Sequence, residues 1–362
     1  MQRMHNKKDF LILAVNVGST STKAALYRNR EFVARETFTY PLDDGSSSLP
    51  DLATQRPRRE KDLLAFIEDH AVDPGNLDII VSRGGLIRPG PSGIYEISPT
   101  MCDDMMTGRY GTHVSALGPA IAFSLARQHH LRAVIVDPPG TDEFEAVARL
   151  SGTPHIRRTS AFHALNQKAA ARKAAGRLGR RYEAVNLIVA HLGGGITIGA
   201  HKRGRVVDST HGLSEGPFTP ERAGTLPTSG LIDLIRTGKF DDATLQAHLV
   251  GRGGLTAYLG TNRAEEVEAR IERGDEDARL VYQAMAYQIA KDIGAMSTVL
   301  QGDVDGIVLT GGLAHSDRLT EWIGDRVEFL APLFRFPGED EMEAMADGAL
   351  RVLQGRENSI KY

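Results

Sequence analysis

Short apolar runs separated by turn residues dominate the first forty positions of the chain. From Phe10 the sequence reads FLILAVNV, GSTS, TKAALY, RNRE and FVARETF. Runs of this length, rich in β-branched and aromatic residues, predict an antiparallel meander of three strands. The first strand ends in Gly18, Ser19, Thr20 and Ser21, with Lys23 close by. Free backbone N–H groups, hydroxyls and a cation at one point predict a phosphate-binding turn.

The same order of strand, glycine-rich turn, strand, basic turn and strand returns from Leu187 in LIVAHLGGGITIGAHKRGRVVDSTHG. Aligning Asn16 with His191 places Gly18 on Gly193, an offset of 175 residues without a gap. Internal similarity on this scale predicts duplicated domains rather than a solenoid.

The rest of the pattern predicts alternating helices and strands. The expected elements are a loop over 42–57, a helix over 58–70, a strand over 77–82, a helix over 113–130, a strand over 133–137, helices over 141–152 and 160–179, a loop over 214–227, an amphipathic helix over 276–302, a strand over 305–312, and a last strand and helix over 334–353. Ser160 is the expected N-cap of its helix, with His163 in the first turn.

Composition narrows the class of protein. A chain of 362 residues exceeds one ordinary domain, so two lobes are expected, with the cleft between them as the default ligand site. A net charge of -3 gives no argument for binding nucleic acid or an anionic membrane. The single cysteine, Cys102, excludes an intrachain disulfide framework. With no secretory signal and no apolar run of membrane-spanning length, we expect a cytoplasmic protein.

Polar residues at element ends supply the candidate chemistry. Arg83 ends a strand, Arg222 stands in a loop rich in Pro and Gly, and Asp137 ends a buried strand before two prolines. Asp137 is a candidate ligand or base, and a turn-forming Asp is the alternative. Three glycine-rich junctions in a duplicated chain favour a phosphate-bearing ligand. Because the sequence has no GxxxxGK[ST] motif and no HRD or DFG set, the common nucleotide folds are excluded.

Eight motifs in order carry a family resemblance: NVGSTSTK, SRGGLIRPG, VDPP, RTSAFHALNQKA, VAHLGGGITIGAHKRGRVVDSTHG, FTPERAGTLPT, LTGGLAHS and FPGEDEMEA. Over nearly the whole chain they resemble the butyrate kinases, which stand with acetate and propionate kinases in the acetokinase branch of the sugar kinase, Hsp70 and actin superfamily. The resemblance implies an α/β fold of two duplicated ribonuclease H-like domains (βββαβα), an actin-like ATPase fold with an interdomain cleft, and a homodimer. It implies an acyl-substrate domain over 1–140 with a C-terminal helix over 341–362, and a nucleotide-binding domain over 141–340.

The implied activity is a reversible, direct in-line phosphoryl transfer between ATP with Mg²⁺ and a short-chain carboxylate, giving ADP and an acyl phosphate. A carboxylate with a pKa near about 4 is ionised at neutral pH, so the nucleophile needs cancellation of charge rather than a general base.

By resemblance, Arg83 lies near the substrate carboxylate, Arg222 and His163 act on the transferring phosphoryl group, and Asp137 lies near metal and substrate. Glu341 is the implied magnesium ligand, with Asp340 in the alternative register. The implied nucleotide-binding residues are Asn16, Ser19, Ser21, Lys23, His191, Gly193, Gly195, Gly311 and Gly312.

Departures from the family pattern bear on the substrate. Gly194 stands where acetate kinases carry Asn, LAHS replaces their IGEN, and Ala116 stands where butyrate kinases carry Asn. That last change affects the surroundings of His113, the match to a second active-site histidine.

The implied acyl pocket contains Gly85, Thr112, His113 and Phe162. Gly85 and Thr112 leave room for an acid longer than acetate, and Phe162 supplies an apolar wall. We therefore expect butyrate, isobutyrate or a related branched acid. The alternatives are a propionate or acetate kinase, and an ATP-binding switch of the Hsp70 or actin kind without kinase activity.

Overall fold

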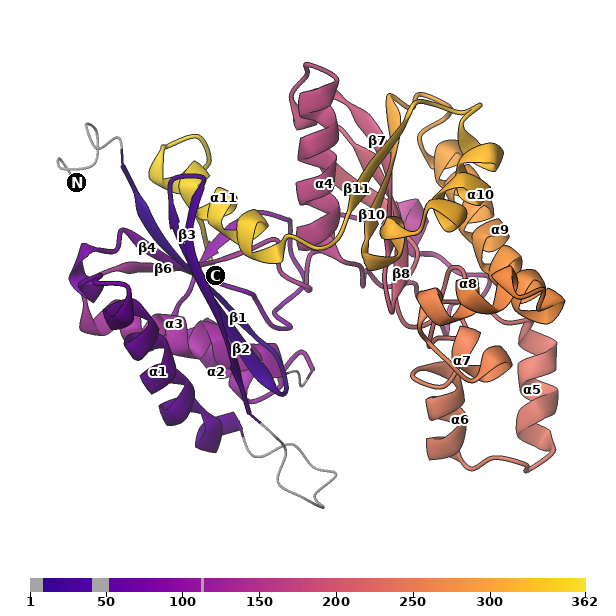
Figure 1. The fold of residues 1–362 in the computed structure, drawn as a ribbon, viewed down its shortest axis with the longest axis horizontal. Helices are drawn as coiled ribbons and strands as arrows, with labels where there is room; N and C mark the ends of the chain where they lie inside the picture. Colours follow the sequence, from indigo (N-terminus) through magenta and orange to yellow (C-terminus); the bar gives the residue numbers. More distant parts are fainter. Residues whose placement is uncertain (1–8, 41–51, 112–113) are drawn as a thin grey trace. The chain divides into compact units, whose positions relative to one another are not determined.

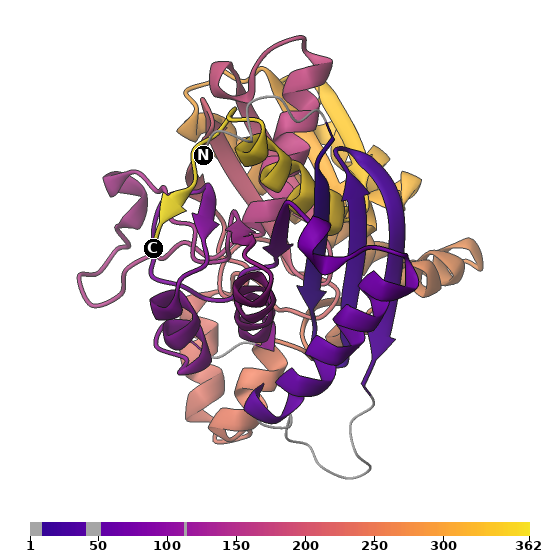
Figure 2. The same cartoon turned by 90° about the vertical axis from the view of Figure 1, so that its left-hand side faces the viewer.

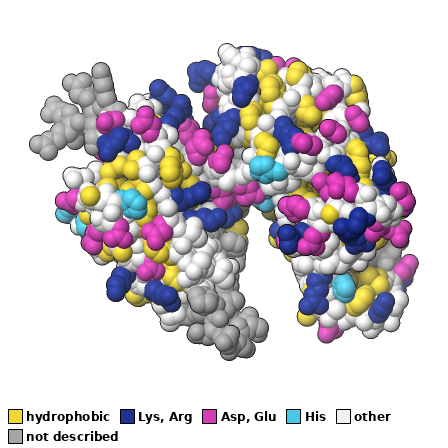
Figure 3. Space-filling model, in the orientation of Figure 1, with side chains coloured by type: hydrophobic (Ala, Val, Ile, Leu, Met, Phe, Trp, Pro, Cys, Tyr) yellow, Lys and Arg dark blue, Asp and Glu magenta, His cyan; other side chains and the backbone are white. Residues whose placement is uncertain are grey.

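The computed structural model describes residues 9–40, 52–111 and 114–362. The chain divides into two compact units, each built on one mixed β-sheet (Figure 1). Unit 1 comprises Met1–Thr141 and Asp340–Tyr362, and unit 2 comprises Asp142–Glu339. Acidic and basic side chains are interspersed over the face of each unit that Figure 3 presents, in keeping with the small net charge of -3.

The two sheets share a five-strand arrangement. The strands of unit 1 are β1 Leu11–Val17, β2 Ser21–Arg28, β3 Glu31–Thr39, β4 Ile79–Ser82, β5 Ile94–Glu96, β6 Arg132–Val136 and β12 Ile360–Lys361, in the order β12-β5-β6-β4-β1-β2-β3. The strands of unit 2 are β7 Asn186–Leu192, β8 Ile196–Lys202, β9 Arg205–Ser209, β10 Gly306–Gly311 and β11 Leu333–Pro337, in the order β11-β10-β7-β8-β9.

The predicted duplication is confirmed in these sheets. A shift of 175 residues converts the bounds of β1 into those of β7. In both sheets the first strand pairs antiparallel with the second and parallel with the strand on its other side, β4 or β10. Both second-to-third strand pairs carry a register irregularity near the same aligned position. The fold is therefore the expected duplicated α/β architecture.

Helices cover the sheets. Those of unit 1 are α1 Leu52–Asp69, α2 Pro99–Met106, α3 Leu117–Gln128 and α11 Glu341–Leu353. Those of unit 2 are α4 Ala164–Arg177, α5 Thr228–Arg236, α6 Asp242–Leu249, α7 Gly254–Leu259, α8 Ala264–Glu272, α9 Glu276–Val299 and α10 Asp317–Val327. Short 3₁₀ helices lie at η1 Pro74–Asn76, η2 Val114–Ala116, η3 Ala146–Arg149, η4 Tyr182–Ala184 and η5 Gly312–His315. In the described part of the chain, no helix is both long enough and apolar enough to cross a membrane.

In two places the chain passes from a strand of one unit to a helix of the other. The chain leaves β6 of unit 1 and forms α4, which packs on β7 and β10. It leaves β11 of unit 2 and forms α11, which packs on β1, β4 and β6. Figure 2 shows the sheet of unit 1 with α1 and α3 on one face and α11 on the other. α11 thus brings residues distant in sequence to the end of β1, whereas α4 covers β7, the strand that follows it.

Alternation along β1 determines which side chain meets which helix. The strand is buried throughout because both of its faces are covered. Leu13 and Val15 pack in one cluster with Leu63 of α1. Successive strand residues point to opposite faces, so Asn16 faces α11 and contacts Glu341, its first residue.

The same alternation operates in β7. Ile188 and Ala190 pack in the cluster that contains α9, whereas Val189 packs with α4. His191 lies on the α4 face and contacts Asn166 in the first turn of that helix. The two residues aligned in the sequence therefore occupy equivalent places in the two sheets.

Four predictions of local structure were wrong. The C-terminal helix expected over 341–362 ends at Leu353, and Ile360–Lys361 form the strand β12. The helix expected over 141–152 is an irregular segment with a single 3₁₀ turn, because the Asp142 carboxylate binds the Arg149 guanidinium at 2.6 and 2.7 Å and also accepts the Phe144 N–H. The helix expected from Ser160 begins at Ala164, with His163 at the N-cap. The loop expected up to Pro57 gives way to α1 at Leu52, with Pro57 inside the helix.

Candidate functional site

A cavity of about 660 Å³ in unit 2 lies where two neighbouring parallel strands end. Its walls come from the turn after β7, the turn after β10, the loop before α5 and the start of α8. The lining residues are Gly193, Gly194, Pro220, Glu221, Asn262, Arg263, Ala264, Glu265, Glu268, Gly312, Leu313, His315 and Ser316. The carboxyl ends of parallel strands are the usual ligand-binding edge of an open α/β sheet, and this volume suits a nucleotide-sized ligand.

The glycines at this edge allow close backbone approach. Gly311 has a φ of 91°, and a Cβ there would collide with the carbonyl of Leu192. Gly311 also exchanges two backbone hydrogen bonds with Gly338. Gly312 has open space around its Cα and lines the cavity. Three predicted nucleotide-binding glycines, Gly193, Gly311 and Gly312, therefore lie at or beside this cavity.

Arg222 lies against the second glycine turn. A Cβ on Gly195 would stand 2.7 Å from its Cζ, so the guanidinium occupies the space that a side chain would fill. Nη1 donates to the carbonyl of Gly212 at 2.6 Å, and the buried Nε has no hydrogen-bond partner among the described residues. Burial lowers the pKa of the guanidinium from its ordinary value, and the group remains a cation at neutral pH. The arrangement presents a desolvated positive charge at the turn.

The backbone that carries Arg222 is tied to the same turn. Thr219 Oγ1 donates to the carbonyl of Gly194 at 2.6 Å and accepts the Arg222 N–H at 3.0 Å. Glu221 points toward Gly194, where a Cβ would lie 3.4 Å from Oε1. One short loop thus delivers a cation and a carboxylate to the two sides of the glycine turn.

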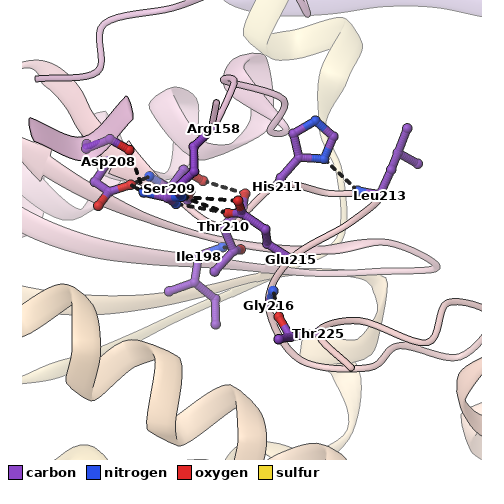
Figure 4. A network of polar contacts seen from close by, with 11 residues as sticks. Arg158, Ile198, Asp208, Ser209, Thr210, His211, Leu213, Glu215, Gly216 and Thr225 are labelled. Atoms are coloured by element: carbon purple, nitrogen blue, oxygen red, sulfur yellow. Dashed lines mark hydrogen bonds and ion pairs between the residues drawn. The ribbon is translucent and has the colours of Figure 1, made fainter. Parts of the chain in front are cut away.

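Arg158 stabilises the loop whose Gly212 carbonyl accepts the hydrogen bond from Arg222. Figure 4 shows the contacts of Arg158 with this loop. Its guanidinium binds Glu215 at 2.9 Å, Asp208 at 2.9 Å and the carbonyl of Ser209 at 2.9 Å. The hydrogen bond to Glu215 is the main reason that its pKa is raised. These contacts brace residues 208–215, which include the Gly212 carbonyl.

His163 and His191 stack face to face, with ring centroids 3.8 Å apart and planes 15° apart. His163 Nδ1 lies 2.9 Å from Thr197 Oγ1. His191 Nδ1 lies 2.8 Å from Asn166 Oδ1, and its Nε2 lies 3.1 Å from a carboxylate oxygen of Glu339. Both histidines are therefore fixed in orientation, His163 at the N-cap of α4 and His191 at the end of β7.

In unit 1, Asn16, Arg83 and Glu341 meet. The Asn16 side-chain amide donates to Glu341 Oε2 at 2.6 Å, and Arg83 Nη2 lies 3.3 Å from Glu341 Oε1. The Arg83 side chain is 35% exposed, so its guanidinium keeps solvent-facing surface for a ligand. Residues predicted separately as a phosphate contact, a carboxylate contact and a metal ligand thus form one cluster.

The first glycine turn is organised by Arg59, which sequence reasoning missed. Its buried guanidinium donates to the carbonyls of Gly18, Ser19 and Ser21 at 2.9 to 3.0 Å. The Gly18 N–H donates to the Ser21 carbonyl at 2.8 Å, so this donor already has a partner inside the turn. Lys23 is exposed on β2, paired in register with Asn16.

Asp137 has a structural partner. It adopts a φ of 40°, and its Oδ1 accepts the Gly93 N–H at 2.9 Å, while its own N–H donates to the Gly93 carbonyl at 2.9 Å. The carboxylate therefore anchors the segment before β5 to the end of β6. Its role as a metal or substrate ligand stays a prediction.

The expected acyl-pocket residues fall in different surroundings. A Cβ on Gly85 would lie 3.1 Å from Ala116 Cα and 3.2 Å from Met105 Sδ, so close packing surrounds this glycine. Phe162 is buried in unit 2 with Ala164 and Val206. Thr112 and His113 lie outside the described residues.

A sequence profile described as the Acetokinase family matches residues 145–330, more than half of the chain. The chain belongs to the acetokinase family. Solved structures share the fold of this acetokinase-family chain. The acetate kinase of Porphyromonas gingivalis is 18% identical, with a TM-score of 0.75 over 95% of this chain and 99% of that one. A propionate kinase of Francisella tularensis is 19% identical, with a TM-score of 0.70 over 94% and 98%. The acetate kinase of Entamoeba histolytica is 15% identical, with a TM-score of 0.74 over 93% and 98%.

Several site residues of this acetokinase-family member carry no signal in the sequence. Arg59 and Arg158 act through carbonyls and carboxylates far away in sequence, which no local motif reveals. Thr197 and His201 are an exception in part. Polar Thr197 and His201 alternate with apolar residues in a buried strand, a pattern that indicates a polar partner on one face.

Proposed function

We propose that this chain is a carboxylate kinase, which transfers the γ-phosphoryl group of ATP to a short-chain carboxylate and runs reversibly with acyl phosphate and ADP. Within that class we propose butyrate or a branched analogue as the acid. The family membership supports the reaction class, and the collinear motifs that resemble butyrate kinases support the acid.

The observation that carries the proposal is Arg222 against the glycine turn. The half-buried guanidinium of Arg222, whose buried Nε has no hydrogen-bond partner among the described residues, lies over Gly195 beside a nucleotide-sized cavity. This arrangement suits a phosphoryl group that enters with negative charge. The fork of a guanidinium binds such oxygens in pairs. His163 would add a hydrogen-bond donor, which stabilises the charge of the transferring phosphoryl group in the transition state.

The cluster in unit 1 supports recognition of the acid. The ionised carboxylate is already a nucleophile, so the enzyme has to reduce repulsion between two anions. Arg83 is the candidate for binding the carboxylate. This assigns the acid to unit 1 and the nucleotide to unit 2.

Magnesium fits the same cluster. Mg²⁺ prefers hard oxygen ligands and takes one or two carboxylates together with phosphate oxygens, so Glu341 and Asp340 would hold it. When bound, the ion supplies neutralisation of phosphate charge. Asn16 orients the Glu341 carboxylate through their hydrogen bond of 2.6 Å.

A hydroxamate assay for acyl phosphate tests the reaction. The purified protein with MgATP and butyrate should form hydroxamate, and Arg222→Ala should lower kcat by about 10²-fold or more with little change in KM for ATP. Arg236→Ala is the matched control, because Arg236 is 75% exposed on α5. Failure to phosphorylate any acid would refute the reaction, and near-normal turnover of Arg222→Ala would refute the role of that residue.

A panel of acids from two to five carbons tests the proposed substrate. We expect kcat/KM to be highest for butyrate or a branched analogue, with neighbours tolerated, because one methylene in an apolar pocket contributes only about 1–3 kcal/mol. A maximum at acetate or propionate would assign the chain to those kinases instead.

A further inference from the structure

A chain of buried hydrogen bonds runs from Tyr182 to His163 inside unit 2. His163 and Gln167 are four residues apart, so they lie on one face of α4. Thr197 and His201 are four residues apart in β8, so they lie on one face of the sheet. Gln167, Thr197 and His201 are fully buried, so each polar atom needs a partner inside the protein.

Gly199 makes this chain possible. It stands between Thr197 and His201 on the same face of β8, and the Gln167 amide lies across it. A Cβ there would come within 2.5 Å of Gln167 Oε1. Because Gly199 has no side chain, the Gln167 side chain of α4 can occupy this space.

The main chain fixes the direction of the Gln167 amide. One end of the amide lies 3.0 Å from the carbonyl oxygen of Thr197 and 2.8 Å from Thr197 Oγ1. A carbonyl oxygen is only an acceptor, so this end has to be the NH₂ group. The other end, Oε1, then accepts from His201 Nε2 at 3.0 Å.

His201 and Tyr182 complete the chain on its inner side. Burial lowers the pKa of His201 well below its ordinary value, and the positive charges of Lys168 and Arg172 add to the effect. The ring is therefore neutral and carries one hydrogen, on Nε2. Its Nδ1 is an acceptor and lies 2.7 Å from the Tyr182 hydroxyl, which donates.

The outer side of the chain reaches His163. Thr197 Oγ1 accepts from the Gln167 NH₂ group and lies 3.4 Å from the His163 backbone N–H, another donor. Its own hydrogen is left for His163 Nδ1 at 2.9 Å. A ring nitrogen that accepts this bond carries no hydrogen in the neutral imidazole, so the hydrogen is on Nε2.

We propose that Gln167, Thr197 and His201 are positioning residues that hold His163 as the tautomer with its hydrogen on Nε2. The inference rests on the proposed function in one respect: it makes Nε2–H the group that donates to the transferring phosphoryl oxygen. The chain of bonds supplies a donor of fixed direction at the N-cap of α4. The stacking of His163 on His191 holds the plane of the ring.

The tautomer is measurable without any substrate. The protein is labelled with ¹⁵N at histidine, and the ring nitrogen shifts are recorded at about pH 8.5, two units above the ordinary pKa of imidazole. The His163 signals are identified by their loss in His163→Gln. We expect the hydrogen on Nε2 of His163. A hydrogen on Nδ1 would overturn the proposal, whatever the enzyme does.

Thr197→Val tests the consequence for turnover. The change removes the hydroxyl and keeps the shape, so the His163 tautomer should become mixed and kcat should fall about 10²-fold with both KM values within about twofold. Thr197→Ser restores the hydroxyl and should recover most of the turnover and the Nε2–H signal. Unchanged tautomer and unchanged kcat in Thr197→Val would refute the proposal.

Two further outcomes can be distinguished from failure of the tautomer proposal. If Thr197→Val does not fold, the spectrum of the unaltered protein decides the tautomer, and Gln167→Leu replaces it as the variant for kinetics. If the protein phosphorylates no acid, the proposed function fails, while the tautomer is still decided by the nitrogen shifts.

Discussion

Replacing Gly195 by alanine would place a methyl group against the guanidinium of Arg222. The new Cβ would lie 2.7 Å from Cζ and 3.1 Å from Nη2, whereas ordinary contacts at a Cβ are 3.4 Å or longer. The backbone of Gly195 lies outside the left-handed region, so alanine adds no torsional strain there. The substitution should therefore act only by displacing the Arg222 guanidinium.

The structure gives the size of the effect. Relief of the overlap moves the guanidinium by roughly 1 Å, a displacement that costs about 10²-fold in rate when the moved group acts in the transition state. The same movement breaks the 2.6 Å hydrogen bond to Gly212. Stability should fall by at most about 2 kcal/mol, the contribution of one charged hydrogen bond, because the displaced atoms end a flexible side chain.

Hydroxamate formation and urea unfolding measure the two quantities separately. Gly176→Ala is the matched control, since Gly176 is exposed on α4 with open space around it. This control should leave kcat unchanged and raise the unfolding free energy by about 0.5–1 kcal/mol through helix propensity. If Gly195→Ala folds and keeps kcat within about twofold of the unaltered enzyme, the reasoning about Arg222 is refuted.

The remaining predictions concern the packing of unit 1. Arg59→Met leaves three carbonyls of the first glycine turn without their donor, so the unfolding free energy from urea titration should fall by about 3 kcal/mol or more. Arg56→Met, which removes a partly exposed ion pair with Glu60, should lower it by about 0.5 kcal/mol, and equal losses would contradict the role of Arg59. Gly85→Val should lower stability by about 1–3 kcal/mol, because its Cβ meets the backbone of Ala116, and should shift the ratio of kcat/KM toward acetate or propionate; unchanged calorimetric stability would count against the packing argument. Burial raises the pKa of the Cys102 thiol to about 11, so at pH 8 the folded protein should react with iodoacetamide about 100-fold more slowly than the urea-unfolded chain, and more rapidly as pH rises toward 11; equal rates at pH 8 would show an accessible thiolate.

Duplication explains why sequence reasoning reached the architecture. An order of apolar runs, a glycine-rich turn and a basic turn repeats at an offset of 175 residues, and a pattern of this kind depends only on local sequence. The two meanders and the glycine turns followed from it, whereas the parallel pairing of β4 and β10 with the first strands is seen only in the structure. The predicted helix over 141–152 failed because Asp142 and Arg149 form a contact of side chains that helical periodicity does not register.

In the candidate site, likewise, the sequence marks some residues but not their contacts. Glycine junctions, Arg222 and the two aligned residues Asn16 and His191 could be selected from the sequence, because strand ends and turn residues mark them. The residues that contact them could not be selected from the sequence. Glu341 reaches Asn16, 325 residues away along the chain, because α11 packs on β1. Asn166 reaches His191 because α4 packs on β7, the strand that follows it.

The sequence by itself determined the duplicated α/β fold, its strand-to-turn junctions and the class of chemistry that cations at such junctions support. These features depend on short-range periodicity and on residue chemistry. Only the tertiary structure decided that Arg222 lies over Gly195, that Arg59 holds the first turn and that Gln167 directs the hydrogen of His163 through Thr197. The reason is physical: the orientation of a buried polar group is determined by the donors and acceptors that surround it, and those come from segments that meet only in the folded protein.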